Sequence, residues 1–110
     1  MKKFLKFKKN KFGLIGLGGF IAERHLKVIK SLSQELGICH DIIDSVGLID
    51  RYFPNAKFEL NYKNYLKNLK KERIKYNIIC SPNYLHYKHI KDTLKLGINA
   101  IVEKPPVLKQ

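Results

Sequence analysis

A glycine-rich turn directly after a short apolar run constrains the fold of this chain more than any other feature. Residues 12–15 form the apolar run, Gly16-Leu17-Gly18-Gly19 follows, and a segment with helical apolar spacing begins at Phe20. Glycines carry no Cβ atom, so an anion can come close to the backbone there. The free N–H groups and positive dipole end of the next helix then favour phosphate groups. This strand–turn–helix context predicts a dinucleotide-binding turn.

Two registers describe the glycines of this turn. The pattern G-x-G-x-x-G uses Gly16 and Gly18 but meets Ile21 at its third glycine position, which is a departure. The pattern G-x-x-G-x-x-A uses Gly16, Gly19 and Ala22 and fits better. The residues expected to contact the cofactor here are Gly16, Gly18, Gly19, Phe20 and Ile21.

The rest of the chain alternates short apolar runs with helical stretches, which is typical of parallel strands joined by crossover helices. Strands are predicted at residues 12–15, 36–40, 57–60, 77–80 and 100–102, and helices at 20–33, 44–52, 62–74 and 84–96. Right-handed crossovers wind such elements into a doubly wound α/β sheet of order 3-2-1-4-5 with helices on both faces.

The helix boundaries and inner faces are predicted from single residues. Asn83 is expected to be the N-cap of the last helix, and Gly97 to follow its end. The first helix is expected to bury Ala22, Leu26, Ile29 and Leu32, which recur at helical spacing.

The length of 110 residues leaves room for one domain. We expect a dinucleotide-binding domain at residues 11–110 and a basic N-terminal extension at residues 1–10. No apolar run approaches the roughly 20 residues that span a bilayer, and no signal segment is evident, so no membrane partner and a cytoplasmic location are expected.

The formal net charge of +13 is abnormal and can indicate a nucleic-acid partner. The lysines are nevertheless spread along the chain and are dense only in residues 1–11 and 63–75. A solvated basic face is the preferred interpretation, and a partner or domain that carries balancing acids is the alternative. Basic and aromatic residues interleave on none of the predicted strands, so a nucleic-acid partner is not expected.

Two cysteines and two histidines are candidate metal ligands. Cys39 and Cys80 lack metal-binding spacing and are expected to be buried free thiols. His86 and His89 stand three residues apart on one predicted helix, but no third ligand is placed to join them. No metal is expected.

Asp41 ends the second predicted strand about 20 residues beyond the glycines, where an acid binds the adenosine ribose in dinucleotide-binding folds. Its carboxylate would accept hydrogen bonds from the ribose hydroxyls and repel a 2′-phosphate. NAD is therefore favoured over NADP. The alternative is that Asp41 only caps the following turn.

Polar residues also follow the fourth and fifth predicted strands. Ser81, Asn83 and His86 come after the fourth strand, and ligands of such sheets bind outside the carboxyl ends of the strands. Glu103 and Lys104 interrupt the apolar end of the fifth. A lysine beside the cationic nicotinamide ring has a lowered pKa, which suits proton transfer from a sugar hydroxyl. The alternative is a solvated strand end.

The glycine turn, Ser81-Pro82-Asn83 with His86, and Glu103-Lys104-Pro105 together resemble the glucose–fructose oxidoreductase and inositol dehydrogenase family (Gfo/Idh/MocA). The resemblance covers essentially the whole chain after Asn10. Segments 19–25, 41–47, 52–58 and 80–86 are most similar to its UDP-N-acetylglucosaminuronate 3-dehydrogenases. Pro106 stands where the family usually has leucine.

The resemblance implies the chemistry. Those enzymes use NAD to oxidise the sugar C3 hydroxyl, in a pathway to bacterial surface polysaccharides. By that likeness, Lys104 would lie beside the nicotinamide and the substrate hydroxyl as the catalytic residue, and Glu103 would hold the nicotinamide ribose. Asn83 and His86 would line the same pocket, and Asp41 would hold the adenosine ribose.

Family members continue into a second α/β domain that supplies substrate contacts, a catalytic histidine and the homo-oligomer interface, and this sequence ends before it. We therefore expect a dehydrogenase fragment that binds NAD and does not turn over a UDP-sugar alone. The alternative is a standalone module that binds NAD(H) in a regulatory capacity.

Overall fold

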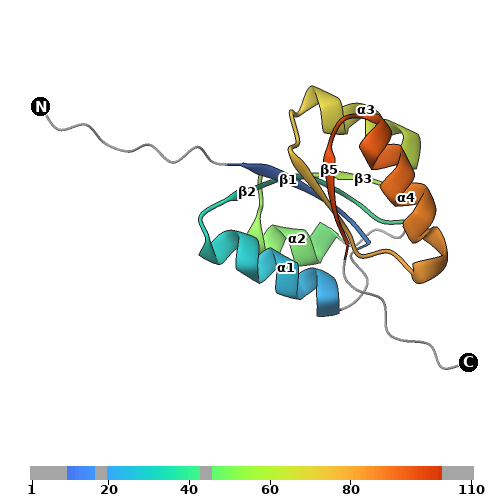
Figure 1. Ribbon diagram of the computed structural model, residues 1–110. Helices are drawn as coiled ribbons and strands as arrows, with labels where there is room; N and C mark the ends of the chain where they lie inside the picture. Colours follow the sequence, from blue (N-terminus) through green and yellow to red (C-terminus); the bar gives the residue numbers. More distant parts are fainter. Residues whose placement is uncertain (1–9, 17–19, 43–45, 103–110) are drawn as a thin grey trace, which may run out of the picture.

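The computed structural model describes residues 10–16, 20–42 and 46–102. Nine elements follow one another as alternating strands and helices (Figure 1). In chain order they are β1 (Lys11–Ile15), α1 (Phe20–Ser31), β2 (Glu35–His40), α2 (Val46–Tyr52), β3 (Lys57–Glu59), α3 (Tyr62–Lys71), β4 (Tyr76–Ile79), α4 (Asn83–Lys95) and β5 (Asn99–Val102).

The five strands form one parallel sheet in the order β3-β2-β1-β4-β5, which confirms the predicted order. The strand ends lie level across the sheet. Ile15 pairs with His40 on one side and with Ile79 on the other, and Ile79 pairs with Val102. The carboxyl ends of β1, β2, β4 and β5 therefore meet along a single edge.

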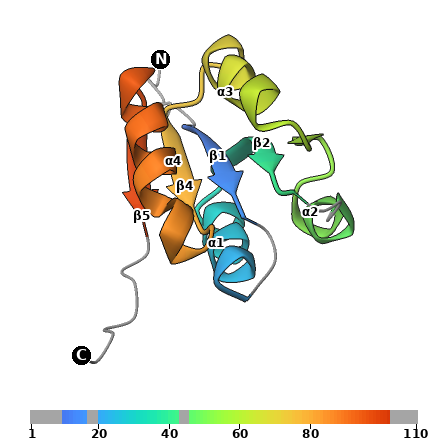
Figure 2. The same ribbon diagram turned by 90° about the vertical axis from the view of Figure 1, so that its right-hand side faces the viewer.

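The helices form two layers around this sheet (Figures 1 and 2). Helices α1 and α2 cover one face and α3 and α4 cover the other, so two apolar cores result. Leu14 lies in the core under α1, whereas its neighbour Ile15 lies in the core under α3. Successive strand residues point to opposite faces, so burial of both faces explains why the strands are nearly continuously apolar.

Two expectations about the helices were wrong. Leu32 is 63% exposed, because α1 ends at Ser31 and Ser33 turns the chain away with φ of 58°. Asn83 is not the N-cap of α4 but its first residue. Pro82 occupies the cap position with an extended backbone, and no side chain caps the helix.

Other boundaries follow local chemistry more directly. Gly97 follows α4 with φ of +77°, as predicted for the residue after the C-cap. Helix α3 begins after Asn61, whose side-chain oxygen accepts a hydrogen bond from the backbone N–H of Asn64 at 2.9 Å. This cap is not among the features predicted from the sequence. Within the described ranges, no helix is both long enough and apolar enough to cross a membrane.

Candidate functional site

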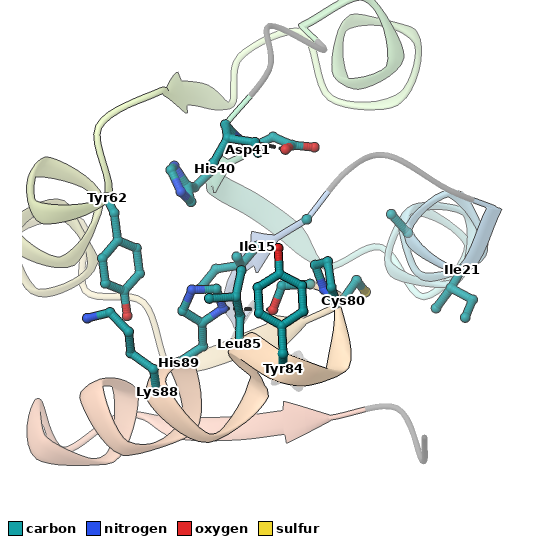
Figure 3. A pocket seen from close by; sticks show the side chains of 15 residues that line it. Ile15, Ile21, His40, Asp41, Tyr62, Cys80, Tyr84, Leu85, Lys88 and His89 are labelled. Carbon is teal, nitrogen blue, oxygen red and sulfur yellow. Dashed lines mark hydrogen bonds between the residues drawn. The ribbon is translucent and has the colours of Figure 1, made fainter. Parts of the chain in front are cut away.

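A cavity of about 520 Å³ opens at the carboxyl edge of the sheet, above the ends of β1, β2 and β4 (Figure 3). Its floor is apolar and includes Ile15 and Leu85. The segments after three strands and the first turns of α4 form its walls. The cavity therefore lies where ligands bind in parallel α/β sheets.

Gly16 fixes the geometry at the centre of this edge. Its φ is +90°, which is a backbone conformation that favours glycine. A Cβ atom at this position would lie 2.7 Å from the carbonyl carbon of Cys80 and 2.7 Å from the backbone nitrogen of Ser81. The backbone N–H of Gly16 also donates to the carbonyl of His40 at 2.8 Å. Only glycine lets β1 end this close to the backbone of the β4 turn.

The other residues predicted for the glycine turn are only partly described. Gly18 and Gly19 lie outside the described residues. Phe20 is the first residue of α1, so the free N–H groups of that helix start directly after the turn. Ile21 lines the cavity with a 41% exposed side chain, and the adjacent Ala22 lines it as well.

Asp41 follows β2 and lines the cavity, as Figure 3 shows. Its Oδ1 atom accepts a hydrogen bond from the backbone N–H of Ile42 at 2.6 Å. The carboxylate thus caps the start of the following segment and also faces the cavity. The two interpretations of Asp41 are therefore compatible with each other.

Ser81, which follows β4, is buried and forms two hydrogen bonds to α4. Its Oγ atom lies 2.7 Å from His89 Nδ1, and its carbonyl oxygen accepts from His86 Nε2 at 2.5 Å. Ser81 lines the cavity, whereas Asn83 is exposed and neither Asn83 nor His86 belongs to the lining. The structure therefore brings Gly16, Asp41 and Ser81 together at the cavity and leaves Asn83 and His86 outside its lining.

A wall of aromatic and basic side chains was not identified from the sequence. The Tyr62 ring centroid lies 5.0 Å from that of His89 and 5.6 Å from that of His40, and Lys88 Nζ lies 4.9 Å from the Tyr62 ring. His40 Nδ1 lies 2.7 Å from the Glu59 carbonyl, so this nitrogen carries the hydrogen. Figure 3 shows these side chains on the side of the cavity next to α3 and α4.

The electrostatics of this wall keep the side chains of His89 and Tyr62 uncharged near neutral pH. Burial, followed by the Coulombic effects of His40 and Lys88, lowers the pKa of His89 to about 4. Burial also raises the pKa of Tyr62, as does the hydrogen bond from its hydroxyl to Asp92 at 2.8 Å.

Glu103 and Lys104 lie outside the described residues. The last residue before them, Val102, ends β5 level with Ile79 and Ile15. The end of β5 at Val102 therefore lies at the same edge of the sheet as Gly16. Among the residues that the structure describes, no group of three or more His, Cys, Asp or Glu side chains is arranged to hold a metal ion.

Comparison with known proteins agrees with this geometry. Residues 10–110 match the family model described as an oxidoreductase family with an NAD-binding Rossmann fold, GFO_IDH_MocA. The WlbA (WbpB) dehydrogenase from Thermus thermophilus, solved with NAD and alpha-ketoglutarate, is 42% identical over 90% of this chain with a TM-score of 0.81. Its complex with NAD and UDP-GlcNAcA is 43% identical over 91% of this chain with a TM-score of 0.78.

A more distant structure shares the fold alone. The myo-inositol 2-dehydrogenase from Lactobacillus plantarum is 22% identical over 89% of this chain, with a TM-score of 0.76. This chain spans 34% of the Thermus thermophilus enzyme and 29% of the Lactobacillus plantarum enzyme. The match over residues 10–110 shows that the chain belongs to the Gfo/Idh/MocA oxidoreductase family, as a domain with its NAD-binding Rossmann fold.

Proposed function

We propose that this chain is the NAD-binding domain of a sugar-nucleotide dehydrogenase that oxidises the C3 hydroxyl of a UDP-linked uronate sugar. The observation that carries the proposal is the 43% identity to the Thermus thermophilus dehydrogenase solved with NAD and UDP-GlcNAcA. The cavity at the carboxyl edge of the sheet supports it, because ligands of parallel α/β sheets bind at that edge.

The residues of this chain fit a dinucleotide. Gly16 lets the end of β1 pack tightly against the backbone of Cys80 and Ser81, and we propose that the pyrophosphate binds at the turn that begins there. Asp41 would accept hydrogen bonds from the adenosine ribose, and its negative charge would disfavour the 2′-phosphate of NADP. The uncharged ring of Tyr62 offers a surface for a flat base. Bound NAD supplies a hydride acceptor.

The catalytic part of the proposal comes from the family resemblance. Glu103 would bind the nicotinamide ribose, and Lys104 would take the proton of the sugar hydroxyl beside it. Because the chain spans 34% of the length of the Thermus thermophilus enzyme, we propose that it binds NAD but needs further protein for UDP-sugar turnover.

Isothermal titration calorimetry of the 110-residue chain with NAD and NADP tests cofactor binding. We expect saturable NAD binding and weaker NADP binding. Asp41→Ala should weaken NAD binding about tenfold, because hydrogen bonds to a charged acceptor contribute about 1.5–3 kcal/mol. Asp50→Ala is the matched control, since Asp50 is exposed on α2 and outside the cavity lining. A folded chain without NAD affinity would refute the proposal.

Turnover is tested separately by following NADH absorbance with UDP-GlcNAcA as the substrate. We expect no NADH from the chain alone, even at saturating NAD. Production of NADH by the chain alone would show that it carries the whole reaction and would contradict this part of the proposal.

A further inference from the structure

Two histidines of α4 bind the same residue, Ser81. His86 Nε2 lies 2.5 Å from the Ser81 carbonyl oxygen, and His89 Nδ1 lies 2.7 Å from Ser81 Oγ. A carbonyl oxygen only accepts, so His86 Nε2 must carry a hydrogen and donate it. Because the two rings lie on one side of α4, both reach back across its first turn to the residue before Pro82.

The Ser81 backbone in turn packs directly against Gly16. A Cβ atom on Gly16 would lie 2.7 Å from both the Ser81 nitrogen and the Cys80 carbonyl carbon. The backbone N–H of Cys80 donates to the Ile15 carbonyl at 2.8 Å, which holds the turn against the end of β1. The position of Ser81 therefore sets the space directly beside Gly16.

His89 is itself held by a buried chain of hydrogen bonds. Thr93 Oγ1 donates to the His89 carbonyl at 2.7 Å and accepts from Asn77 Nδ2 at 2.9 Å. Asn77 Oδ1 accepts from the Tyr65 hydroxyl at 2.6 Å. Asn77, Thr93 and Tyr65 are fully buried. The α4 backbone at His89 is thus anchored to β4 and α3, and the His89 side chain extends from this fixed backbone to Ser81.

We infer that His86 and His89 are positioning residues that clamp Ser81 against Gly16 and thereby shape the half of the NAD site on the β4 side. The inference rests on the proposed function. The sheet order places β2 with Asp41 on one side of β1 and β4 with Ser81 on the other. The adenosine half of NAD is assigned to Asp41, so the clamp acts on the nicotinamide half.

If the clamp acts only on the nicotinamide half of the site, its loss should weaken NAD binding and leave AMP binding unchanged. A general loss of stability would weaken the binding of both ligands. We expect His86→Leu and His89→Leu each to weaken NAD binding by about fivefold to tenfold, because each removes one hydrogen bond to the turn. Affinity for AMP, which lacks the nicotinamide half, should stay within about twofold of the wild type. Isothermal titration calorimetry of the 110-residue chain with both ligands measures the difference.

Conservative variants and a neighbouring control sharpen the test. His86→Gln places an amide nitrogen where Nε2 donated, and His89→Asn places a polar atom at the position of Nδ1, so both should recover most of the NAD affinity. Tyr87→Leu is the control, because Tyr87 is 75% exposed on the same helix and lies outside the cavity lining. It should leave both affinities unchanged.

The outcomes separate this inference from the proposed function. A folded wild-type chain that binds no NAD overturns both. NAD binding that both leucine variants retain at wild-type strength overturns the clamp alone, as does an equal loss of NAD and AMP affinity. If the leucine variants do not fold, ¹⁵N NMR of the wild-type imidazoles decides. The clamp requires a hydrogen on His86 Nε2, and a ring protonated only at Nδ1 would exclude it.

Discussion

At the scale of single residues, substitutions at three glycines distinguish the effect of backbone strain on stability from the effect of steric crowding. Gly16 combines φ of +90° with backbone atoms 2.7 Å from a would-be Cβ, Gly97 has φ of +77° in open space, and Gly47 has neither constraint. We expect Gly16→Ala to lower the free energy of unfolding by more than about 2 kcal/mol and Gly97→Ala by about 1 kcal/mol. Gly47→Ala in α2 should raise it by about 0.5 kcal/mol. Urea unfolding measures all three, and equal losses at Gly16 and Gly97 would show that crowding is unimportant.

His89 makes stability depend on acidity. Burial, followed by the Coulombic effects of His40 and Lys88, lowers its pKa to about 4, while Asp92 raises it and His86 lowers it. In the unfolded chain His89 binds a proton near pH 6.5, whereas in the folded chain it binds one only near pH 4. The contribution of neutral His89 to the free energy of unfolding is fully present above pH 6.5 and is lost as the pH falls towards 4.

The expected loss over that window is on the order of 2 kcal/mol. Urea unfolding at a series of pH values measures it, with His89→Asn as the reference, because asparagine does not titrate there. The difference in free energy between the wild type and this variant should shrink as the pH falls. A difference that stays constant with pH would contradict a buried neutral His89.

The sequence indicated the backbone part of the candidate site better than its side-chain wall. Gly16, Asp41 and Ser81 follow strands whose ends the parallel order brings to one edge, so their meeting is a consequence of topology. His89 and Tyr62 come from helices instead. Tyr62 has the spacing of a core residue, and only the packing of α3 against α4 shows that its ring also faces a cavity.

At the scale of elements, α3 depends on a cap that a single substitution removes. Asn61 Oδ1 accepts from the backbone N–H of Asn64, which has no partner inside the helix. We expect Asn61→Ala to lower the free energy of unfolding by about 1 kcal/mol. Asn64→Ala keeps the backbone N–H and should be neutral or slightly stabilising. Thermal unfolding followed by circular dichroism compares the two, and equal effects would show that the cap contributes nothing.

Strand identity and order were predictable because strands buried on both faces must be apolar throughout. The same logic fails at helix ends. Asn83 has the side chain of a good N-cap, but Pro82 before it already holds an extended backbone and its carbonyl accepts from the Leu85 N–H at 2.9 Å. The helix begins at Asn83 because the backbone of Pro82 is extended, with ψ of 151°. The side-chain preferences of the two residues alone do not determine this angle.

At the scale of the whole molecule, basic side chains far outnumber acidic ones, which gives a formal net charge of +13. Glu72 is already engaged, since it bonds Lys57 at 2.7 Å and lies 3.7 Å from Lys11, and Lys57 chiefly lowers its pKa. Within the described part of the chain, the exposed Lys63 and Lys67 of α3 form no ion pair with an acidic side chain. Lys63, Lys67 and Lys71 recur every four residues, so like charges face one another along the helix.

Reversing the middle charge of this series turns two repulsions into two attractions. We expect Lys67→Glu to raise the free energy of unfolding by about 1 kcal/mol at low salt, and Lys67→Gln to give about half of that gain. Around 1 M salt the Debye length falls to about 3 Å, so both gains should vanish, and the wild type should be more stable than at low salt. Urea unfolding at the two salt concentrations measures these differences. If Lys67→Glu gains as much at high salt as at low salt, the effect comes from helix propensity, and repulsion among the lysines is not what limits the stability of this domain.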